Sequence, residues 1–326
     1  MLGRMNYSSR FFLYAPFALP LLLGAAAGAN WYAVTRPLSR SLVAMNGGAE
    51  AMPGVRLGFK SMSIGGFPFR VDAVFDGFRV EIATKDGPIA WRAEHFALHR
   101  LAYGKDDTIF EAAGRQSLQW GRGRALDFEA GSLHASALRD AGGVKQFDLD
   151  LVAFGSRAFT SGHMQLHLRR RDGSLDVFAS ADELRMPRGE QIKTAMVQAS
   201  ASAPRAFDGL RAGRVTWQSA LEAWRQANGA AHVDAFHVVA DPLDAMGQGG
   251  LRLDDAHRLS GLVDFKIAGM AQWLQREHRG ALADALKARA GAAGGNEAGK
   301  MGVVLGSRDG IAYLGDAPVG TLAPLY

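Results

Sequence analysis

Residues 164–179 read MQLHLRRRDGSLDVFA, with apolar side chains at every second position on both sides of Asp172-Gly173. Successive side chains of a strand point to opposite faces, so each half predicts a strand with one apolar face. Asp-Gly is typical of the tight turn that joins two antiparallel strands. The stretch therefore predicts a β-hairpin.

The same pattern recurs along most of the chain. A second clear hairpin joins residues 250–253 to 261–268, and the 40 glycines favour turns and bulges. Other short strands are predicted at 71–75, 78–82, 89–93, 96–101, 108–112, 118–120, 126–128, 147–151, 192–199, 232–239, 303–305 and 311–314. The sequence predicts a mainly β (α+β) fold, with a large curved antiparallel sheet that is either an open groove or folded on itself.

Two stretches depart from this alternation and predict amphipathic helices. In residues 215–228, Trp217, Leu221 and Trp224 lie on one helical face, and Gly229 follows as a stop signal. Residues 270–290 predict the second helix, and the glycine-rich residues 291–299 predict a linker.

An apolar segment lies near the N-terminus. Residues 11–34 read FFLYAPFALPLLLGAAAGANWYAV, and no charge occurs between Arg10 and Arg36. At ~1.5 Å per residue, such a helix covers the ~30 Å hydrocarbon core of a bilayer. Residues 39–45 are expected to extend this helix or to form a short one that ends at Asn46-Gly47-Gly48.

The segment predicts an uncleaved signal anchor with its N-terminus in the cytoplasm. This divides the chain into residues 1–10 in the cytoplasm, 11–34 in the bacterial inner membrane, and 35–326 as a periplasmic β-rich domain. The anchor residues are Phe11, Leu13, Phe17, Leu21, Leu22, Trp31 and Tyr32. The alternative is a cleaved signal peptide with residues 11–23 as its apolar core and Ala27-Gly28-Ala29 as the cleavage site.

Composition excludes several classes of site. The chain has no Cys, which excludes disulfides, thiolate metal sites, a Cys nucleophile and a lipoprotein anchor. The net charge of +5 is spread along the chain, and its one tight basic cluster, Arg169-Arg170-Arg171, runs into Asp172. No nucleic-acid partner is therefore expected.

The most distinctive motif of the predicted soluble part is GGFPFR: Gly65, Gly66, Phe67, Pro68, Phe69 and Arg70. The glycines allow a sharp bend, and the proline removes a ladder donor, which requires an edge or bulge position. The two phenylalanines are expected to anchor the bend in apolar surface. Arg70 is expected to pair with Asp72 or Asp76, or else to reach a lipid phosphate.

This motif, beyond an apolar N-terminal segment, resembles an uncharacterised family of alphaproteobacterial envelope proteins, a domain of unknown function. Its members end in a late glycine-rich strand and a Pro-Leu-Tyr-like terminus, which residues 311–315 and Pro324-Leu325-Tyr326 resemble. The resemblance implies a location and a shape rather than a chemistry. A looser likeness is to AsmA-like and lipopolysaccharide-transport proteins, whose membrane-anchored β-grooves shield lipid chains.

Motifs for catalysis and cofactors are incomplete. His95 with His99, and His163 with His167, have H-x-x-x-H spacing, but both pairs lie in predicted strands and lack the Glu of H-E-x-x-H. Residues 294–300 fit G-x-x-x-x-G-K, but Met301 replaces the Ser or Thr that binds Mg²⁺. The sequence therefore predicts no catalytic residue, no metal and no cofactor.

The expected function is that of a non-enzymatic, membrane-anchored periplasmic protein, with the inner membrane and a lipid or another envelope protein as partners. An apolar concave sheet would bind lipid or maintain the envelope. Two alternatives remain: a structural envelope protein that acts without a ligand, and a periplasmic hydrolase, which no motif favours.

Overall fold

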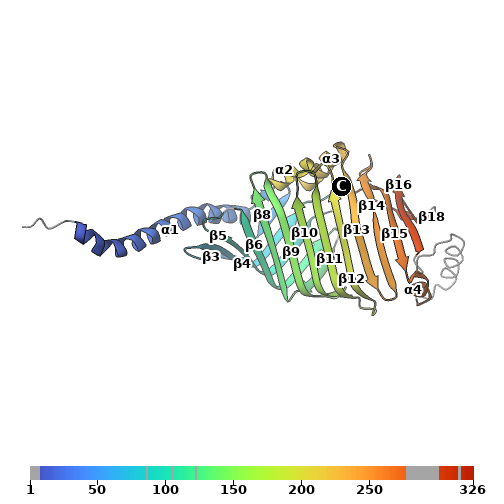
Figure 1. Cartoon of the computed structure of the whole chain (residues 1–326), viewed down its shortest axis with the longest axis horizontal. Coiled ribbons are helices and arrows are strands. Elements are labelled where there is room, and N and C mark those ends of the chain that lie inside the picture. Colours follow the sequence, from blue (N-terminus) through green and yellow to red (C-terminus); the bar gives the residue numbers. More distant parts are fainter. Residues whose placement is uncertain (1–7, 86, 105, 122, 277–300, 315–316) are drawn as a thin grey trace, which may run out of the picture.

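The computed structural model describes residues 8–326 except 86, 105, 122, 277–300 and 315–316, and the side chains of α1 from residue 18 onward. It consists of a long N-terminal helix, an antiparallel sheet of 18 strands and three short helices (Figure 1). The prediction of a mainly β fold built on one large antiparallel sheet is confirmed.

The helices are α1 (Ser8–Asn46), α2 (Asp208–Arg211), α3 (Trp217–Gln226) and α4 (Met270–Arg276), with a 3-10 turn at Pro204–Phe207. The strands are β1 (Glu50–Met52), β2 (Val55–Gly58), β3 (Ser61–Gly65), β4 (Arg70–Ile82), β5 (Ile89–Leu101), β6 (Asp107–Trp120), β7 (Arg124–Glu129), β8 (Ser132–Asp140), β9 (Gly143–Ser156), β10 (Thr160–Arg170), β11 (Leu175–Arg185), β12 (Gln191–Ala201), β13 (Ala230–Ala240), β14 (Leu243–Leu253), β15 (Leu259–Ala268), β16 (Met301–Arg308), β17 (Ile311–Leu314) and β18 (Ala317–Thr321).

Both predicted hairpins form. β10 and β11 pair from Arg170 opposite Leu175 outward, on either side of the Asp-Gly turn, and β14 and β15 pair from Leu253 opposite Leu259. From β8 to β18 each strand pairs with the next along the chain, so this part of the sheet is a meander. The strands succeed one another away from α1 (Figure 1).

Strands β4, β5 and β6 are longer than the sequence predicts, because each continues through an irregularity. Gly77 in β4 has φ +61° and Gly114 in β6 has φ +75°, while β5 shifts register next to His95. Asp76 pairs with His95 and His95 with Ala113, so the three irregularities stand side by side. A bulge bends a strand without ending it. The short strands predicted on either side are therefore wrong as separate elements.

The core lies where the strands nearest α1 enclose one apolar cluster. Its buried members come from α1, β4, β5, β6, β8 and β9: Leu42, Ala73, Phe75, Phe78, Ala93, Phe96, Ala112, Leu133, Leu151 and Phe154. Partly buried side chains such as Phe110 and Met164 pack against it. Figure 1 shows β4–β6 behind β8–β10 in this region, so the sheet surrounds a filled core at its α1 end.

Helix α1 contains the apolar segment 11–34 and continues through residues 39–45 to Asn46, where an end was predicted. Leu42 is buried in the core, and the Asn46 side chain accepts a hydrogen bond of 2.9 Å from the Phe59 backbone N–H. Among the described residues, no helix is both long enough and apolar enough to cross a membrane.

The structure contains one of the two predicted amphipathic helices and the first part of the other. α3 matches the predicted residues 215–228; Thr216 caps its N-terminus, and its Trp224 is buried. α4 begins at Met270 as predicted. The remainder of that helix, the linker at 291–299 and the G-x-x-x-x-G-K match at 294–300 lie outside the described residues.

Candidate functional site

An apolar groove of about 400 Å³ runs across strands β9 to β13. Nearly all of its lining surface is apolar. The lining residues are Leu149, Leu151, Met164, Gln165, Leu166, Ala179, Ser180, Ala181, Ala195, Met196, Val197 and Phe236. Pockets that bind small molecules carry a few polar groups to fix orientation, so a lining with almost none suits a ligand part that has no polar atoms.

Strand register explains the groove. Leu166 pairs with Leu149 on one side and with Ala179 on the other, and Ala179 pairs with Val197. Val197 in turn pairs with Phe236. Cross-strand partners share a face of the sheet, so these side chains form one apolar row.

A second row runs beside the first. Leu151 pairs with Met164, Met164 with Ala181, and Ala181 with Ala195. In both rows β11 supplies an alanine, and in the second row β12 supplies another, whereas β9 and β10 supply the larger leucine and methionine side chains. The groove is therefore a strip of small side chains between larger ones.

The groove is continuous with the core. Leu151 is buried in the core cluster, and the partly buried Leu149 and Met164 pack against that cluster while lining the groove. One face of the sheet is thus covered near α1 and accessible to a ligand from β9 to β13.

At its far end the groove meets an aromatic pair. The rings of Phe236 and Phe265 meet edge to face with centroids 5.5 Å apart. Phe265 lies over Gly247, its partner in register, and a Cβ at Gly247 would come within 2.6 Å of its ring. Glycine at 247 leaves the space that this ring occupies.

The opposite face of β9 and β10 is polar, and there one of the two H-x-x-x-H pairs, His163 with His167, contacts aspartates. His163 lies 3.1 Å from Asp150, and His167 lies 2.7 Å from Asp148. Burial alone would raise the pKa of Asp148, but hydrogen bonds from His167 and Gln146 outweigh it and lower this pKa below its usual value. The spacing of these histidines reflects cross-strand hydrogen bonds to aspartates.

The first histidine pair is arranged likewise on β5. His95 lies 3.0 Å from Asp76, and His99 lies 2.7 Å from Asp72. The pKa of Asp76 is lowered by hydrogen bonds from Ser61 and His95. Within the described part of the chain, no group of three or more His, Cys, Asp or Glu is suited to hold a metal ion.

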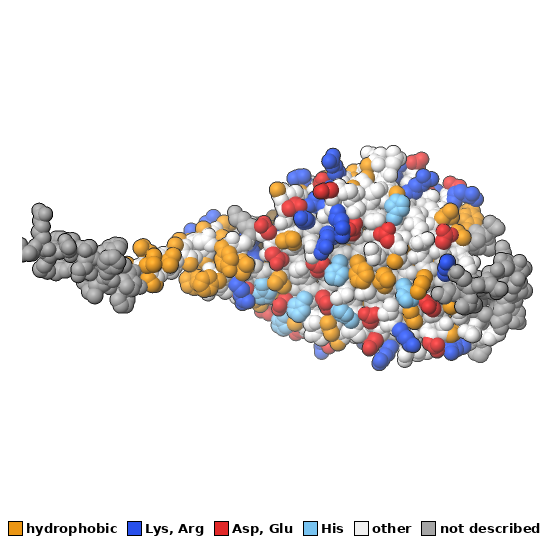
Figure 2. Space-filling view, viewed as in Figure 1, with side chains coloured by type: hydrophobic (Ala, Val, Ile, Leu, Met, Phe, Trp, Pro, Cys, Tyr) orange, Lys and Arg blue, Asp and Glu red, His pale blue; other side chains and the backbone are white. Residues whose placement is uncertain are grey.

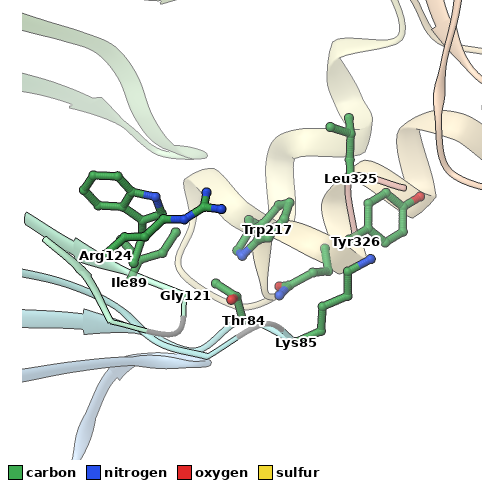
Figure 3. Close-up of a pocket in the computed structure, with 10 residues that line it drawn as sticks. Thr84, Lys85, Ile89, Gly121, Arg124, Trp217, Leu325 and Tyr326 are labelled. Carbon is green, nitrogen blue, oxygen red and sulfur yellow. The ribbon is translucent and has the colours of Figure 1, made fainter. Parts of the chain in front are cut away.

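A larger pocket of about 780 Å³ lies between strand ends and the helical part (Figure 3). Thr84, Gly121 and Arg124 approach it from the strand side, whereas Trp217 of α3 and the C-terminal Tyr326 lie across from them. Its described lining residues include Lys85 and three aromatic rings but no Asp, Glu or His side chain. It offers an aromatic and cationic surface.

The C-terminal residues are held by what we call the C-terminal clasp: Leu325 and Tyr326 with Glu222, Arg225 and His257. The Tyr326 hydroxyl donates to Glu222 at 2.9 Å, and its ring stacks on His257 at 4.5 Å between centroids. The Leu325 N–H donates to the His257 carbonyl at 2.9 Å. Arg225 binds both Glu222 and Asp255 at 2.8 Å. The clasp ties the C-terminus to α3.

These contacts shift two pKa values in opposite directions. Hydrogen bonds from Arg225 and Tyr326 lower the pKa of Glu222 to about 2. Burial and the bond to Glu222 raise the pKa of Tyr326 to about 12. Both shifts favour the charge states that keep the hydrogen bond, so the clasp is intact at neutral pH.

We expect Tyr326→Phe to lower the unfolding temperature at neutral pH, because it removes the hydroxyl that binds ionised Glu222. Because the pKa of Glu222 is lower in the folded protein than its usual value of 4.5, ionised Glu222 stabilises the fold above pH 4.5. This stabilisation is lost as the pH falls toward the folded-state pKa of about 2. The difference between wild type and variant should therefore shrink across that window. Thermal melts at several pH values measure it.

Tyr313→Phe is the matched control, since the Tyr313 ring lies 5.7 Å from the Arg308 guanidinium while its hydroxyl has no partner among the described residues. Its melting temperature should stay at the wild-type value. A Tyr326→Phe deficit that does not vary with pH would contradict the assigned role of Glu222.

In the structure the GGFPFR motif runs from the last residue of β3 across the turn to the first residue of β4, with a cis bond before Pro68. Phe67 and Phe69 are each 63% exposed. The Phe67 ring nevertheless contacts apolar surface, since it meets the Trp31 ring of α1 edge to face at 5.5 Å. Arg70 makes the predicted ion pair with Asp72, at 2.9 Å.

The predicted anchor residues divide into two groups. Leu21, Leu22 and Tyr32 are exposed, whereas the Trp31 indole N–H donates to the Arg70 carbonyl at 2.7 Å. The side chains of Phe11, Leu13 and Phe17 lie outside those described. The structure thus joins the motif to the helix through Trp31, a contact that the sequence does not predict.

The groove residues were also not predicted as a site. Their strands were expected, and the alternation of Ala195, Val197 and Ala199 indicated an apolar face. The available signal is alanine at matching positions of neighbouring strands, but it requires the strand register, which only the structure supplies.

Comparison with known proteins identifies a family rather than a function. No curated protein and no solved structure matches the chain. A family model described as an uncharacterised protein conserved in bacteria, DUF2125, matches residues 31–323 and so covers the whole sheet and the GGFPFR motif. The chain belongs to this family of uncharacterised bacterial proteins.

Proposed function

We propose that this protein is a non-enzymatic, single-span protein of the bacterial inner membrane whose periplasmic sheet binds the acyl chain of a lipid in the groove. The groove from β9 to β13 carries the proposal, because its lining is almost wholly apolar. Its volume of about 400 Å³ falls in the ~300–1,000 Å³ range of small-molecule sites.

The energetics suit a hydrocarbon chain. Each methylene group transferred from water contributes ~0.8 kcal/mol, so several buried methylenes produce a measurable affinity without a polar contact. A polar ligand would lose its hydrogen bonds to water in this groove and find few replacements. The acyl chain is therefore the ligand part that this lining favours.

Membrane attachment is supported by α1. The segment at residues 11–34 carries no charge and belongs to one continuous helix. Its described leucines Leu19, Leu21, Leu22 and Leu23 are between 61% and 75% exposed, which is costly in water and favourable in lipid. We take the helix as an anchor with the sheet on the periplasmic side.

The groove lies on the sheet beyond the end at which α1 joins it, since the strands succeed one another away from the helix (Figure 1). A lipid bound there would be shielded from water at a distance from the bilayer. The proposed role is lipid binding for envelope maintenance.

The test compares full-length variants purified from membranes in detergent, with bound lipid extracted and quantified by mass spectrometry. Ala179→Trp and Ala195→Trp place a large ring in the groove, and we expect both to retain less lipid than wild type. Gln198→Trp is the matched control, because Gln198 is exposed on the opposite face of the same strand, β12.

Lipid held around the anchor is common to all variants, so the comparison isolates the groove. Thermal melts confirm that each variant is folded. Equal lipid content in wild type, Ala179→Trp and Gln198→Trp would overturn lipid binding and favour a structural envelope protein that acts without a ligand.

A further inference from the structure

Two loops beside α1 present large apolar side chains to solvent. Phe67 and Phe69 lie in the GGFPFR turn, and Leu101 and Tyr103 lie at the end of β5 and just after it. Their exposed fractions are 63%, 63%, 45% and 71%. We call these four residues the collar. Contiguous exposed apolar groups on a folded domain mark a surface that contacts a partner or a membrane.

The collar is held firmly against one part of α1. The Trp31 indole donates to the Arg70 carbonyl at 2.7 Å, and its ring meets the Phe67 ring edge to face at 5.5 Å. A Cβ at Gly28 would lie 3.5 Å from the Phe67 ring, so that ring rests directly on the helix.

The second loop is tied to the same place. The Asn30 side chain donates to the Ala102 carbonyl at 3.1 Å, and the Ala102 N–H donates to the Phe69 carbonyl at 2.8 Å. Ala102 itself is buried, with 4% exposed. The backbones of both loops are thus engaged, whereas the side chains of Phe69, Leu101 and Tyr103 stay exposed to solvent.

The position along α1 indicates what covers these side chains. Contacts at Gly28, Asn30 and Trp31 put the collar beside the last turns of the apolar segment 11–34. Gly28 precedes the end of that segment by about 9 Å of helix rise, comparable to the ~5–10 Å to which interfacial apolar faces enter a bilayer. Figure 2 shows hydrophobic side chains on the described part of α1 and on the adjoining tip of the domain.

Charged and aromatic residues of α1 beside the collar also suit a position at the membrane–water interface. Arg36 lies over the exposed Tyr32 ring at 4.6 Å, and Arg40 is exposed one turn further along the helix. Aromatic residues are enriched at membrane–water interfaces, where the ring enters the acyl boundary and polar atoms stay hydrated. Arginines just beyond it attract anionic headgroups.

We propose that the collar inserts into the periplasmic leaflet of the membrane, at the boundary between headgroups and acyl chains, and fixes the sheet against the bilayer. This inference rests on the proposed anchor and extends it. It also assigns a role to the GGFPFR motif: the turn presents two aromatic side chains to lipid, and its backbone binds Trp31.

The experiment uses the absence of cysteine from the chain. Single variants Phe69→Cys, Tyr103→Cys, Leu21→Cys and Gln198→Cys of the full-length protein are spin-labelled and reconstituted into phosphatidylcholine–phosphatidylglycerol vesicles. Collision with oxygen, which concentrates in lipid, is compared with collision with a water-soluble nickel chelate. We expect an oxygen-to-nickel ratio at 69 and 103 between the high value at 21 and the low value at 198.

The possible outcomes test the insertion of the collar separately from the membrane anchor on which it rests. A lipid-like label at 21 together with water-like labels at 69 and 103 would overturn the collar and leave the anchor standing. A water-like label at 21 would overturn the anchor itself. Labels at 69 and 103 that collide with neither reagent would show a protein surface over the collar, and this would also overturn its insertion.

Discussion

Phe75→Ala should cost about 3–5 kcal/mol of unfolding free energy, the range for removing a large aromatic side chain from a packed core. Phe75 is only 1% exposed and contacts three other phenylalanine rings, those of Phe59, Phe78 and Phe96, at 5.1, 5.2 and 5.9 Å between centroids. Because these rings come from separate segments, the cavity left by alanine cannot close by moving one side chain. Chemical unfolding of the full chain in detergent, followed by circular dichroism, measures the loss.

Two further variants serve as controls for the loss of stability in Phe75→Ala. Phe75→Leu keeps most of the volume and should lose less than ~1.5 kcal/mol. Phe69→Ala removes the same side chain where it is 63% exposed and should change stability little in detergent. An equal loss for Phe69→Ala and Phe75→Ala would contradict the location of the core, and an unfolded Phe75→Ala beside a folded Phe75→Leu would support it.

The sequence predicted the features that neighbouring residues determine. The β10–β11 hairpin needs alternation over residues 164–168 and 175–179 and a turn at Asp172-Gly173, all within one short stretch. The amphipathic stripe of α3 and the end of α1 at Asn46 are local in the same sense. Such signals are read from chemistry and periodicity alone.

Features that depend on register or on distant contacts were not predicted. Gly77 reads as the end of a strand, but β4 continues through it with a φ of +61°, beside the register shift between β5 and β6. Alternation marks Ala179 and Ala195 as members of an apolar face without indicating whether anything covers it. The contact of Trp31 with the GGFPFR turn joins residues 39 positions apart, which no local pattern encodes.

Gly249→Ala should destabilise the sheet by about 1–3 kcal/mol or more, the usual cost of adding atoms to a packed site. Gly249 belongs to a glycine-rich stretch, Gly247-Gln248-Gly249-Gly250, which begins like a dinucleotide-binding loop but lies in the interior of β14. A Cβ at Gly249 would overlap the Leu262 carbonyl oxygen and lie 2.6 Å from the Val263 Cα. These are backbone atoms of the neighbouring strand β15, so relief requires the two strands to separate.

Gly250→Ala, one position along the same strand, tests that explanation. A Cβ there has its nearest neighbour, the His232 Nδ1, at 3.8 Å, and alanine reduces the conformational freedom of the unfolded chain relative to glycine. We therefore expect Gly250→Ala to be neutral or slightly stabilising while Gly249→Ala unfolds at lower denaturant concentration. Similar midpoints for the two variants would contradict the close approach of β14 and β15.

The same substitution should also affect the groove. Val263, opposite Gly249, is buried on the face that carries Phe265, so loss of this pairing should loosen the contact between Phe265 and Phe236 at the far end of the groove. Gly249→Ala should then retain less lipid than Gly250→Ala.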